Sequence, residues 1–429
     1  MKLNPSTAKI YTDILHEELI VAMGCTEPIA IAYAAAILRD ALGCEPQEVS
    51  VGLSGNIIKN VKSVIVPATG GMHGIGAAVA AGVIAASPAA QLEVLCQLTE
   101  ADHARIAAWL ERAAVEIHEL NTEHPFEILM TGRAGTDTAE VHLAVRHTNV
   151  VRVACNGKDL TALYRGGEDG TEAIDYADRS ALTVEQIIAY ADTVELDAVR
   201  PLLERQIRMN MAIAEEGIRG EWGAGIGKLL YQNAEGNLSV LVRALAAAGS
   251  DARMSGCELP VCILSGSGNQ GITASVPVIV YARERSMSEE QLLRALIVAD
   301  LITIHQKTGI GCLSAYCGAI SAGCGAATGI CYLEGGKFYE IAHTLVNAVA
   351  ILSGTICDGA KPSCAAKIAM AVEAGMMGYQ MMRAGRQFYG GDGIITKGVE
   401  NTIRNVGRLA RDGMSGTDRE IIRIMLGEN

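Results

Sequence analysis

Two stretches of the chain, AYCGA at 315–319 and GTICDGAKPSC at 354–364, place three cysteines among glycine and alanine residues. Cys317, Cys357 and Cys364 are typical of thiolates that bind one iron-sulfur cluster. A [4Fe-4S] cluster has four irons, so three thiolates leave one iron open to act as a Lewis acid on a substrate. A cluster with four thiolate ligands would indicate electron transfer instead. The three cysteines therefore predict an enzyme with an exposed iron.

The segment around Cys317 offers alternatives for the first of these ligands. It contains four cysteines: Cys312, Cys317, Cys324 and Cys331. Their spacings of five and seven residues do not match the C-x-x-C pairs of zinc sites. Each of the four also fits a small buried residue of a helix. Spacing alone does not distinguish Cys317 from Cys312 or Cys324.

The composition describes a chain that can bury a site away from water. Its 429 residues and 45.1 kDa are enough for two domains, each with its own core. The most apolar run, at 75–86, is shorter than the ~20 residues that a membrane-spanning helix needs. A net charge of −13 disfavours nucleic acid and anionic membranes as partners. The composition favours a small-molecule substrate and leaves undecided whether the chain forms a homo-oligomer.

The first residues, MKLNPS, lack the regions of a signal peptide, which predicts a cytoplasmic protein. That compartment keeps thiols reduced, so the 12 cysteines are not expected to form disulfides. The cysteines can then serve as metal ligands, as nucleophiles or as core residues. We interpret six of them as core residues: Cys44, Cys96, Cys155, Cys257, Cys262 and Cys331.

Hydrophobic periodicity predicts the secondary structure and changes character near residue 184. Before that point, helices are predicted over 7–21, 27–42 and 75–86, and strands over 48–53, 61–66, 115–120, 126–131, 140–146 and 150–155. The last four strands alternate apolar with polar residues, as in an antiparallel sheet with one solvated face. After that point, long helices are predicted, including 195–215, 222–233, 238–248 and 288–299.

The predicted fold class is therefore α+β. An N-terminal mixed α/β domain at 1–180 carries Cys25, and an all-helical domain at 181–429 carries the cluster ligands. The stretch at 161–181, rich in glycine and acidic residues, is the predicted linker.

Cys25 lies in the sequence GCTEP at 24–28, directly before a predicted helix. Thr26 is a suitable N-cap, with Pro28 in the first turn. A thiolate at the amino end of a helix is stabilised by the dipole and the free amides. The sequence therefore predicts a lowered pKa for Cys25, in the range of a general base.

Three further motifs are SGN at 54–56 with Asn60 nearby, GGMHG at 70–74, and GSGNQG at 266–271. Together with GCTEP and the cysteine stretches, they resemble the L-cysteine desulfidases and, less closely, the catalytic alpha chain of the iron-sulfur L-serine dehydratases. The steps of forty residues from Cys317 to Cys357 and seven from Cys357 to Cys364 match the ligand spacing of that family. Serine dehydratases instead have a Ser-Ser-His stretch at the place of Cys25, and usually a fourth cysteine near the carboxyl end. The resemblance therefore favours a desulfidase.

The resemblance implies a reaction. Substrate at the open iron loses its alpha proton to a base and its beta substituent to the iron, and the aminoacrylate product hydrolyses to pyruvate and ammonia. For L-cysteine the leaving group is sulfide, which iron binds well. Cys25 matches the family's proposed catalytic cysteine. No lysine lies in a motif typical of a Schiff base, so pyridoxal phosphate is not expected as a cofactor.

Amide side chains are the candidates for holding the substrate. Asn56, Asn60, Asn269 and Gln270 both donate and accept hydrogen bonds, which suits a carboxylate and an ammonium, although asparagine is also common in turns. His73 either orients or protonates the substrate, or is structural.

The resulting hypothesis is an oxygen-sensitive [4Fe-4S] lyase that converts L-cysteine to pyruvate, ammonia and hydrogen sulfide. One alternative is the same chemistry on L-serine. Another is a non-catalytic iron-sulfur redox sensor, in which Cys25 has no chemical role.

Overall fold

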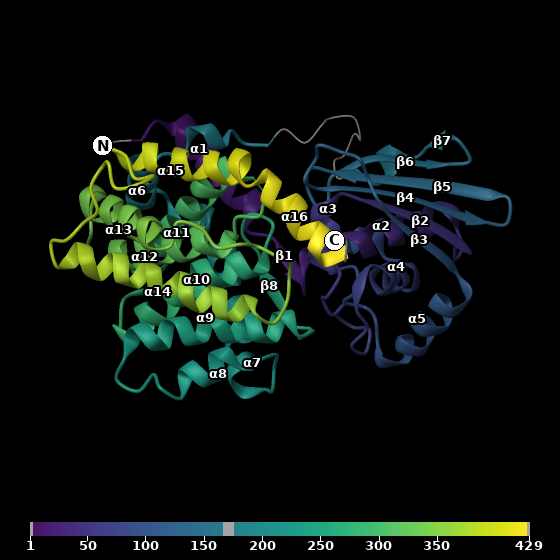
Figure 1. The fold of residues 1–429 in the computed structure, drawn as a ribbon, viewed down its shortest axis with the longest axis horizontal. Coiled ribbons are helices and arrows are strands. Elements are labelled where there is room, and N and C mark those ends of the chain that lie inside the picture. Colours follow the sequence, from purple (N-terminus) through teal and green to yellow (C-terminus); the bar gives the residue numbers. More distant parts are fainter. Residues whose placement is uncertain (1–2, 166–175, 312, 427–429) are drawn as a thin grey trace.

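The computed structural model describes residues 3–165, 176–311 and 313–426. A mixed part is built around one sheet, and a larger part consists mostly of helices (Figure 1). The predicted α+β class is confirmed. Part of the predicted linker, 166–175, lies outside the described residues.

The six-stranded sheet of the mixed part has the order β3-β2-β4-β5-β6-β7. Its strands are β2 (Glu48–Leu53), β3 (Ala114–Glu119), β4 (Glu127–Ala134), β5 (Asp137–Ala144), β6 (Val150–Cys155) and β7 (Lys158–Asp159). β2 and β3 pair in parallel, and the other neighbours pair antiparallel. The antiparallel sheet predicted from alternating residues is confirmed for β4, β5 and β6. It is wrong for the strand predicted over 115–120, because β3 is an edge strand that pairs only with β2, in parallel.

Helices cover one face of this sheet. They are α2 (Thr26–Leu42) and, behind it, α4 (Gly74–Ala85) and α5 (Glu100–Arg112). Gly132 of β4 lets Leu38 of α2 approach, since a Cβ there would lie 2.6 Å from the leucine side chain. Gly82 does the same between α4 and α2, where a Cβ would lie 2.0 Å from the carbonyl oxygen of Ala32. Small residues thus set how closely these layers pack.

The strand predicted over 61–66 is wrong. The SGN motif before it begins the helix α3 (Gly55–Val61), which extends to the first residue of the predicted strand. Ile57, Ile58 and Val61 are spaced as on one face of a helix, and all three are buried. Ile65 then forms only an isolated β-bridge, with His73.

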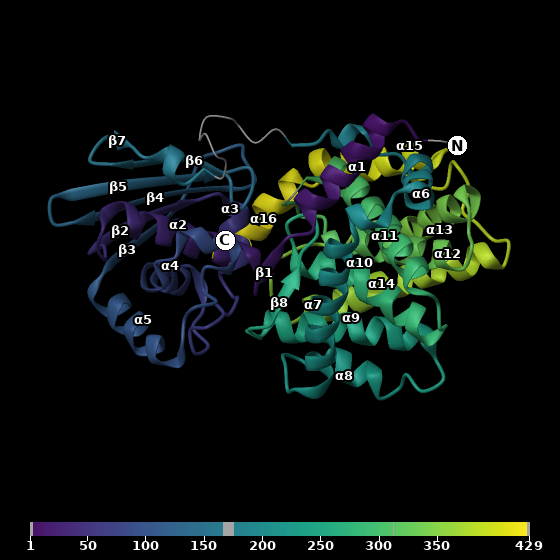
Figure 2. The same ribbon diagram turned by 180° about the vertical axis from the view of Figure 1, so that it is seen from behind.

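The larger part packs long helices directly against one another (Figure 2). Its helices are α6 (Val184–Thr193), α7 (Arg200–Arg219), α8 (Ile226–Tyr231), α9 (Leu238–Met254), α10 (Gly268–Glu284), α11 (Glu289–Ile310), α12 (Gly318–Leu333), α13 (Phe338–Ile351), α14 (Cys364–Arg383), α15 (Val399–Arg408) and α16 (Ser415–Leu426). Many of the glycines lie at helix contacts. A Cβ on Gly323 of α12, for example, would lie 2.5 Å from the carbonyl oxygen of Ala371 on α14. No described helix is long and apolar enough to span a membrane.

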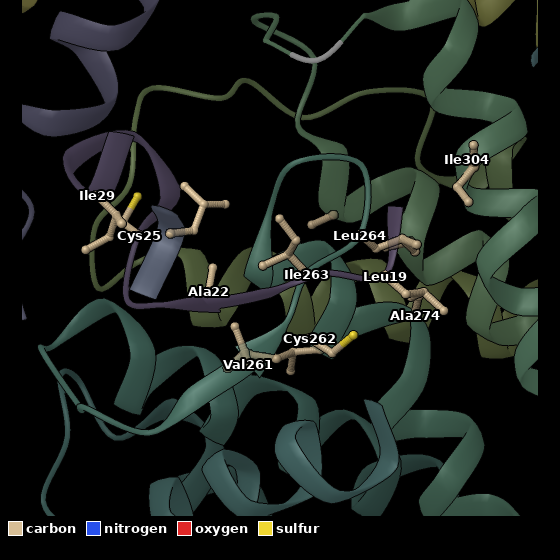
Figure 3. Packing of buried hydrophobic residues seen from close by; sticks show 14 of the residues in the cluster. Leu19, Ala22, Cys25, Ile29, Val261, Cys262, Ile263, Leu264, Ala274 and Ile304 are labelled. Carbon is tan, nitrogen blue, oxygen red and sulfur yellow. The ribbon is translucent and has the colours of Figure 1, made fainter. Parts of the chain in front are cut away.

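The two parts exchange segments. β1 (Val21–Met23), just before Cys25, pairs antiparallel with β8 (Pro260–Cys262), so the region 181–429 is mostly rather than wholly helical. Figure 3 shows Ala22 beside Val261 and Ile263, with Cys25 at the start of α2. α1 (Pro5–Glu18) lies with the helical part, whereas α16 contacts α3 of the mixed part (Figure 1). The division of the chain at residue 180 stays a prediction.

Candidate active site

A cavity of about 100 Å³ lies where the mixed part meets the helical part. Cys25 and Asn60 line it from the mixed part. The helical part contributes the three candidate ligands, Cys317, Cys357 and Cys364, together with Asn269 and Gln270. Seven of the residues expected at the site are thus brought to one cavity, although they are spread over 340 positions of the sequence.

A short backbone pairing sets Cys317 beside Cys357. The amide of Cys317 donates to the carbonyl of Thr355 at 2.8 Å, and the amide of Cys357 donates to the carbonyl of Ala315 at 2.7 Å. The two thiols are close enough to hydrogen-bond to each other. Cys364 follows in the first turn of α14 and lines the same cavity.

The other cysteines near Cys317 are placed differently. Cys324 is buried inside α12 and does not line the cavity. Cys312 lies outside the described residues. Among the described alternatives, only Cys317 is therefore adjacent to Cys357.

The donor set suits a cluster better than a single metal ion. Within the described ranges, no group of three or more His, Cys, Asp or Glu side chains is arranged to hold one ion. A cluster needs no such convergence, because each thiolate binds the iron at its own corner. The hydrogen bond from Cys317 lowers the pKa of Cys357, and the positive charges of Lys59 and Lys367 act in the same direction. The same hydrogen bond raises the pKa of Cys317, and burial raises the pKa of Cys364. Three thiols near Lys367 fit the ligands of a cluster, whose irons would replace the thiol protons.

Four helices begin at this cavity. Their N-cap residues are Cys25 for α2, Ser267 for α10, Cys317 for α12 and Ser363 for α14. In none of these four helices does the N-cap side chain make a capping hydrogen bond. The amino ends of helices carry partial positive charge and unpaired amides, so four of them together favour anionic groups in the cavity.

Cys25 is hydrogen-bonded to a buried carboxylate. Its Sγ donates to Oε2 of Glu27 at 3.1 Å, and Nδ2 of Asn60 donates to Oε1 of the same carboxylate at 2.9 Å. Cys25 itself is the N-cap, and the expected N-cap, Thr26, is the first helical residue. The hydroxyl of Thr26 donates to the carbonyl of Gly266 at 2.9 Å, which ties α2 to the GSGNQG motif.

The lowered pKa expected for Cys25 is wrong. Burial raises the pKa of this thiol well above its ordinary value, and the charge of Glu27 adds to the rise. Burial alone would also raise the pKa of Glu27, but the charge of His147 and the hydrogen bonds from Cys25 and Asn60 outweigh it, so the pKa of this carboxyl is lowered. Cys25 and Glu27 are therefore a thiol and a carboxylate, and the thiol proton is donated in the hydrogen bond between them.

A buried arginine completes the lining. Nη1 of Arg253, at the end of α9, donates to Oδ1 of Asn269 at 3.1 Å. The amide of Gln270 lies against Gly318, where a Cβ would be 2.5 Å from its Cδ. Glycine beside Cys317 thus leaves room for the Gln270 side chain.

Residues 89–423 match the family model for the serine dehydratase alpha chain. The chain belongs to this family. A UPF0597 protein from Desulfitobacterium hafniense is 51% identical over 97% of this chain and 96% of its own. One from Treponema denticola is 45% identical over 99% of this chain and its full length. The relation to the serine dehydratase alpha chain that the motifs suggested is confirmed. This family relation indicates a lyase of the iron-sulfur dehydratase type.

Two residues predicted to bind the substrate lie away from the cavity. Asn56 is in the first turn of α3, and His73 is the exposed N-cap of α4; neither lines the cavity. Two of the six cysteines interpreted as core residues, Cys44 and Cys96, are exposed. Cys155 is partly buried, and Cys257, Cys262 and Cys331 are buried.

Sequence reasoning missed Glu27 and Arg253. Glu27 had a signal, because it is an acidic residue at the start of a helix whose next eleven residues, 28–38, are all buried. A carboxylate in such a helix needs a partner. Arg253 had no comparable signal, because only the packing of α9 against α10 brings it to the cavity.

Proposed function

We propose that the protein is an iron-sulfur L-cysteine desulfidase, which converts L-cysteine and water to pyruvate, ammonia and hydrogen sulfide. One observation carries the proposal: Cys25 shares a small cavity with Cys317, Cys357 and Cys364 in a member of the serine dehydratase alpha chain family. The residues that we propose as base and as metal ligands thus line the same cavity.

Cys317, Cys357 and Cys364 would hold a [4Fe-4S] cluster, whose open iron supplies a Lewis acid for the departing sulfur. Lys59 and Lys367 offset part of the negative charge of the thiolates. The partial positive charges at the amino ends of the helices around the cavity also offset this negative charge.

Cys25 and Glu27 would remove the alpha proton as a pair. The substrate's alpha proton goes to Sγ of Cys25 while the thiol proton passes along the existing hydrogen bond to Oε2 of Glu27. The pair gains one proton in total, and the electrons of the broken C–H bond form the double bond of aminoacrylate as sulfide leaves. Asn60 holds the other carboxylate oxygen and so fixes the orientation of Glu27. This pairing lets a buried thiol of raised pKa act as a base.

L-serine is the second candidate substrate, and the family match favours it. The elimination is the same, with hydroxide as the leaving group. We place L-cysteine first because Cys25 stands where the serine dehydratases have a Ser-Ser-His stretch.

Steady-state kinetics of protein prepared and assayed without oxygen test the proposal. Wild type should release pyruvate and sulfide from L-cysteine with a higher kcat/KM than pyruvate from L-serine. Cys25→Ala should retain its iron but lose about 10²- to 10⁴-fold in kcat, the usual contribution of a general base. Cys257→Ala, at a buried cysteine outside the cavity, should turn over like wild type.

A larger kcat/KM for L-serine would assign the protein to the second candidate. Full activity of Cys25→Ala on both amino acids would reject Cys25 as the base. Iron-containing wild type that attacks neither amino acid would contradict the proposed lyase.

A further inference from the structure

Arg253 is a buried cation that forms no ion pair with any described residue. Only 3% of the residue is exposed, and it lines the cavity that contains Cys25. Its Nη1 is bonded to Asn269, but its Nε and Nη2 are buried with no hydrogen-bond partner among the described residues. Burying unpaired donors of a charged group costs free energy unless another group accepts their hydrogen bonds. The guanidinium of a residue that lines the cavity thus has two donors without a partner among the described residues.

The guanidinium lies against the amino end of α10. A Cβ on Gly268, the first residue of this helix, would be 2.3 Å from Nε of Arg253, so only glycine leaves space for it. The N-cap Ser267 makes no capping hydrogen bond from its side chain. The positive end of a 17-residue helix therefore adds to the charge of Arg253.

The acidic side chains that the structure describes do not neutralise this charge by contact. No ion pair within the described ranges includes Arg253, and its interactions with Glu27 and Cys25 act through space. Glu27 already accepts hydrogen bonds from Cys25 and Asn60. A planar guanidinium with two free donors matches a carboxylate, which it binds through two parallel hydrogen bonds. A carboxylate of a bound ligand would therefore satisfy both donors.

We propose that Arg253 binds the alpha-carboxylate of the substrate, with Asn269 holding the guanidinium in place. This inference rests on the proposed function, because it concerns the same cavity, and it restricts the substrates to amino acids with a free alpha-carboxylate. Arg253, Cys25 and Cys364 line the same small cavity, so an anion bound there to Arg253 lies near the proposed base and one proposed cluster ligand. Amines, amides and esters that lack the carboxylate are excluded as good substrates.

Kinetics of the cluster-containing enzyme separate a carboxylate-binding role from a structural one. Arg253→Gln should raise KM for the amino-acid substrate about 10- to 100-fold, as expected for loss of one charge-assisted contact, with a smaller change in kcat. Arg253→Lys should recover part of the loss, because it restores a single charge without the fork of donors. Gly268→Ala, which displaces the guanidinium without removing its charge, should also raise KM. Arg243→Gln, on the same helix and paired with Glu373 outside the cavity, is the matched control and should leave KM unchanged.

A binding measurement distinguishes failure of this inference from failure of the proposed function. L-alanine has the carboxylate and ammonium of the substrate but no leaving group, and L-alaninamide lacks the carboxylate. Calorimetric titration should show that wild type binds L-alanine and not L-alaninamide, and that Arg253→Gln loses this preference. This result would support the inference even if neither L-cysteine nor L-serine were turned over.

Two results would overturn the inference. One is equal binding of L-alanine and L-alaninamide by wild type. The other is a lower iron content in Arg253→Gln together with an unchanged KM of the enzyme that still contains iron. This second result would show that Arg253 balances the charge of the cluster and does not bind the substrate. Should Arg253→Gln fail to fold, Arg253→Lys and Gly268→Ala still test the expected rise in KM.

Discussion

Replacing Glu27 by glutamine tests the proposed proton-sharing pair. The substitution keeps the size and the hydrogen bond to Asn60 but removes the charge that accepts the Cys25 thiol proton at 3.1 Å. A hydrogen bond to a charged group contributes about 1.5–3 kcal/mol, and a change of 1.36 kcal/mol shifts a pKa by about one unit. Because the carboxylate stabilises the protonated thiol, its loss should lower the pKa of Cys25 by about 1–2 units.

The assay is the pH dependence of Cys25 alkylation, followed by mass spectrometry of the peptide that contains it. Alkylation of Glu27→Gln should begin about 1–2 pH units below that of wild type. Its kcat should nevertheless fall about 10²- to 10⁴-fold, because the thiol proton has no acceptor. Glu48→Gln, at a half-exposed carboxylate on the sheet, should change neither quantity. An unchanged or higher alkylation pH in Glu27→Gln would refute the pairing.

Two further substitutions test the electrostatics and packing of the fold. Burial raises the pKa of Asp300 to about 7, whereas an aspartate in an unfolded chain has a pKa of about 3.9. The folded protein therefore holds this proton more tightly than the unfolded chain does. The resulting stabilisation is complete below about pH 4 and is lost as the pH rises through 7. Asp300→Asn should therefore raise Tm relative to wild type more at pH 8 than at pH 4. The control Asp197→Asn, at a side chain 98% exposed, should change Tm equally at both pH values. An equal change of Tm at pH 4 and pH 8 in Asp300→Asn would contradict the raised pKa. Gly82→Ala should destabilise the fold by about 1–3 kcal/mol in urea unfolding, because its Cβ would lie 2.0 Å from a backbone oxygen of α2. Gly76→Ala, on the same helix with its nearest neighbour at 3.6 Å, should be neutral or stabilising, and equal losses in both variants would contradict the packing.

Most of the sheet could be predicted from the sequence because buried and less buried residues alternate along much of β4 and β5. β2 and β6 agree with the predicted ranges 48–53 and 150–155. The helices around the cysteines were harder to predict, since α12 is buried on nearly all sides and has no polar stripe that would reveal its period. The strand predicted over 61–66 failed because Val61 ends α3 and Ile65 forms only an isolated β-bridge, so Val64 and Val66 are buried without a neighbouring strand to pair with.

The cysteines of the candidate site could be predicted because each stands in a short, recognisable motif. The direction of the Cys25 pKa could not, because the helix end stabilises a thiolate while Glu27, buried beside it, stabilises the thiol. Arg253 depends on a contact between α9 and α10 that no local pattern records.

Iron and acid-labile sulfide, measured per chain in protein purified without oxygen, test most directly whether the three thiols hold a cluster. We expect about four irons per chain in wild type and in Cys324→Ala, since Cys324 is buried inside α12 away from the cavity. Cys317→Ala should lose most of this iron. Wild type that binds no iron after anaerobic reconstitution, or Cys317→Ala that retains all of it while Cys324→Ala loses it, would contradict the assignment.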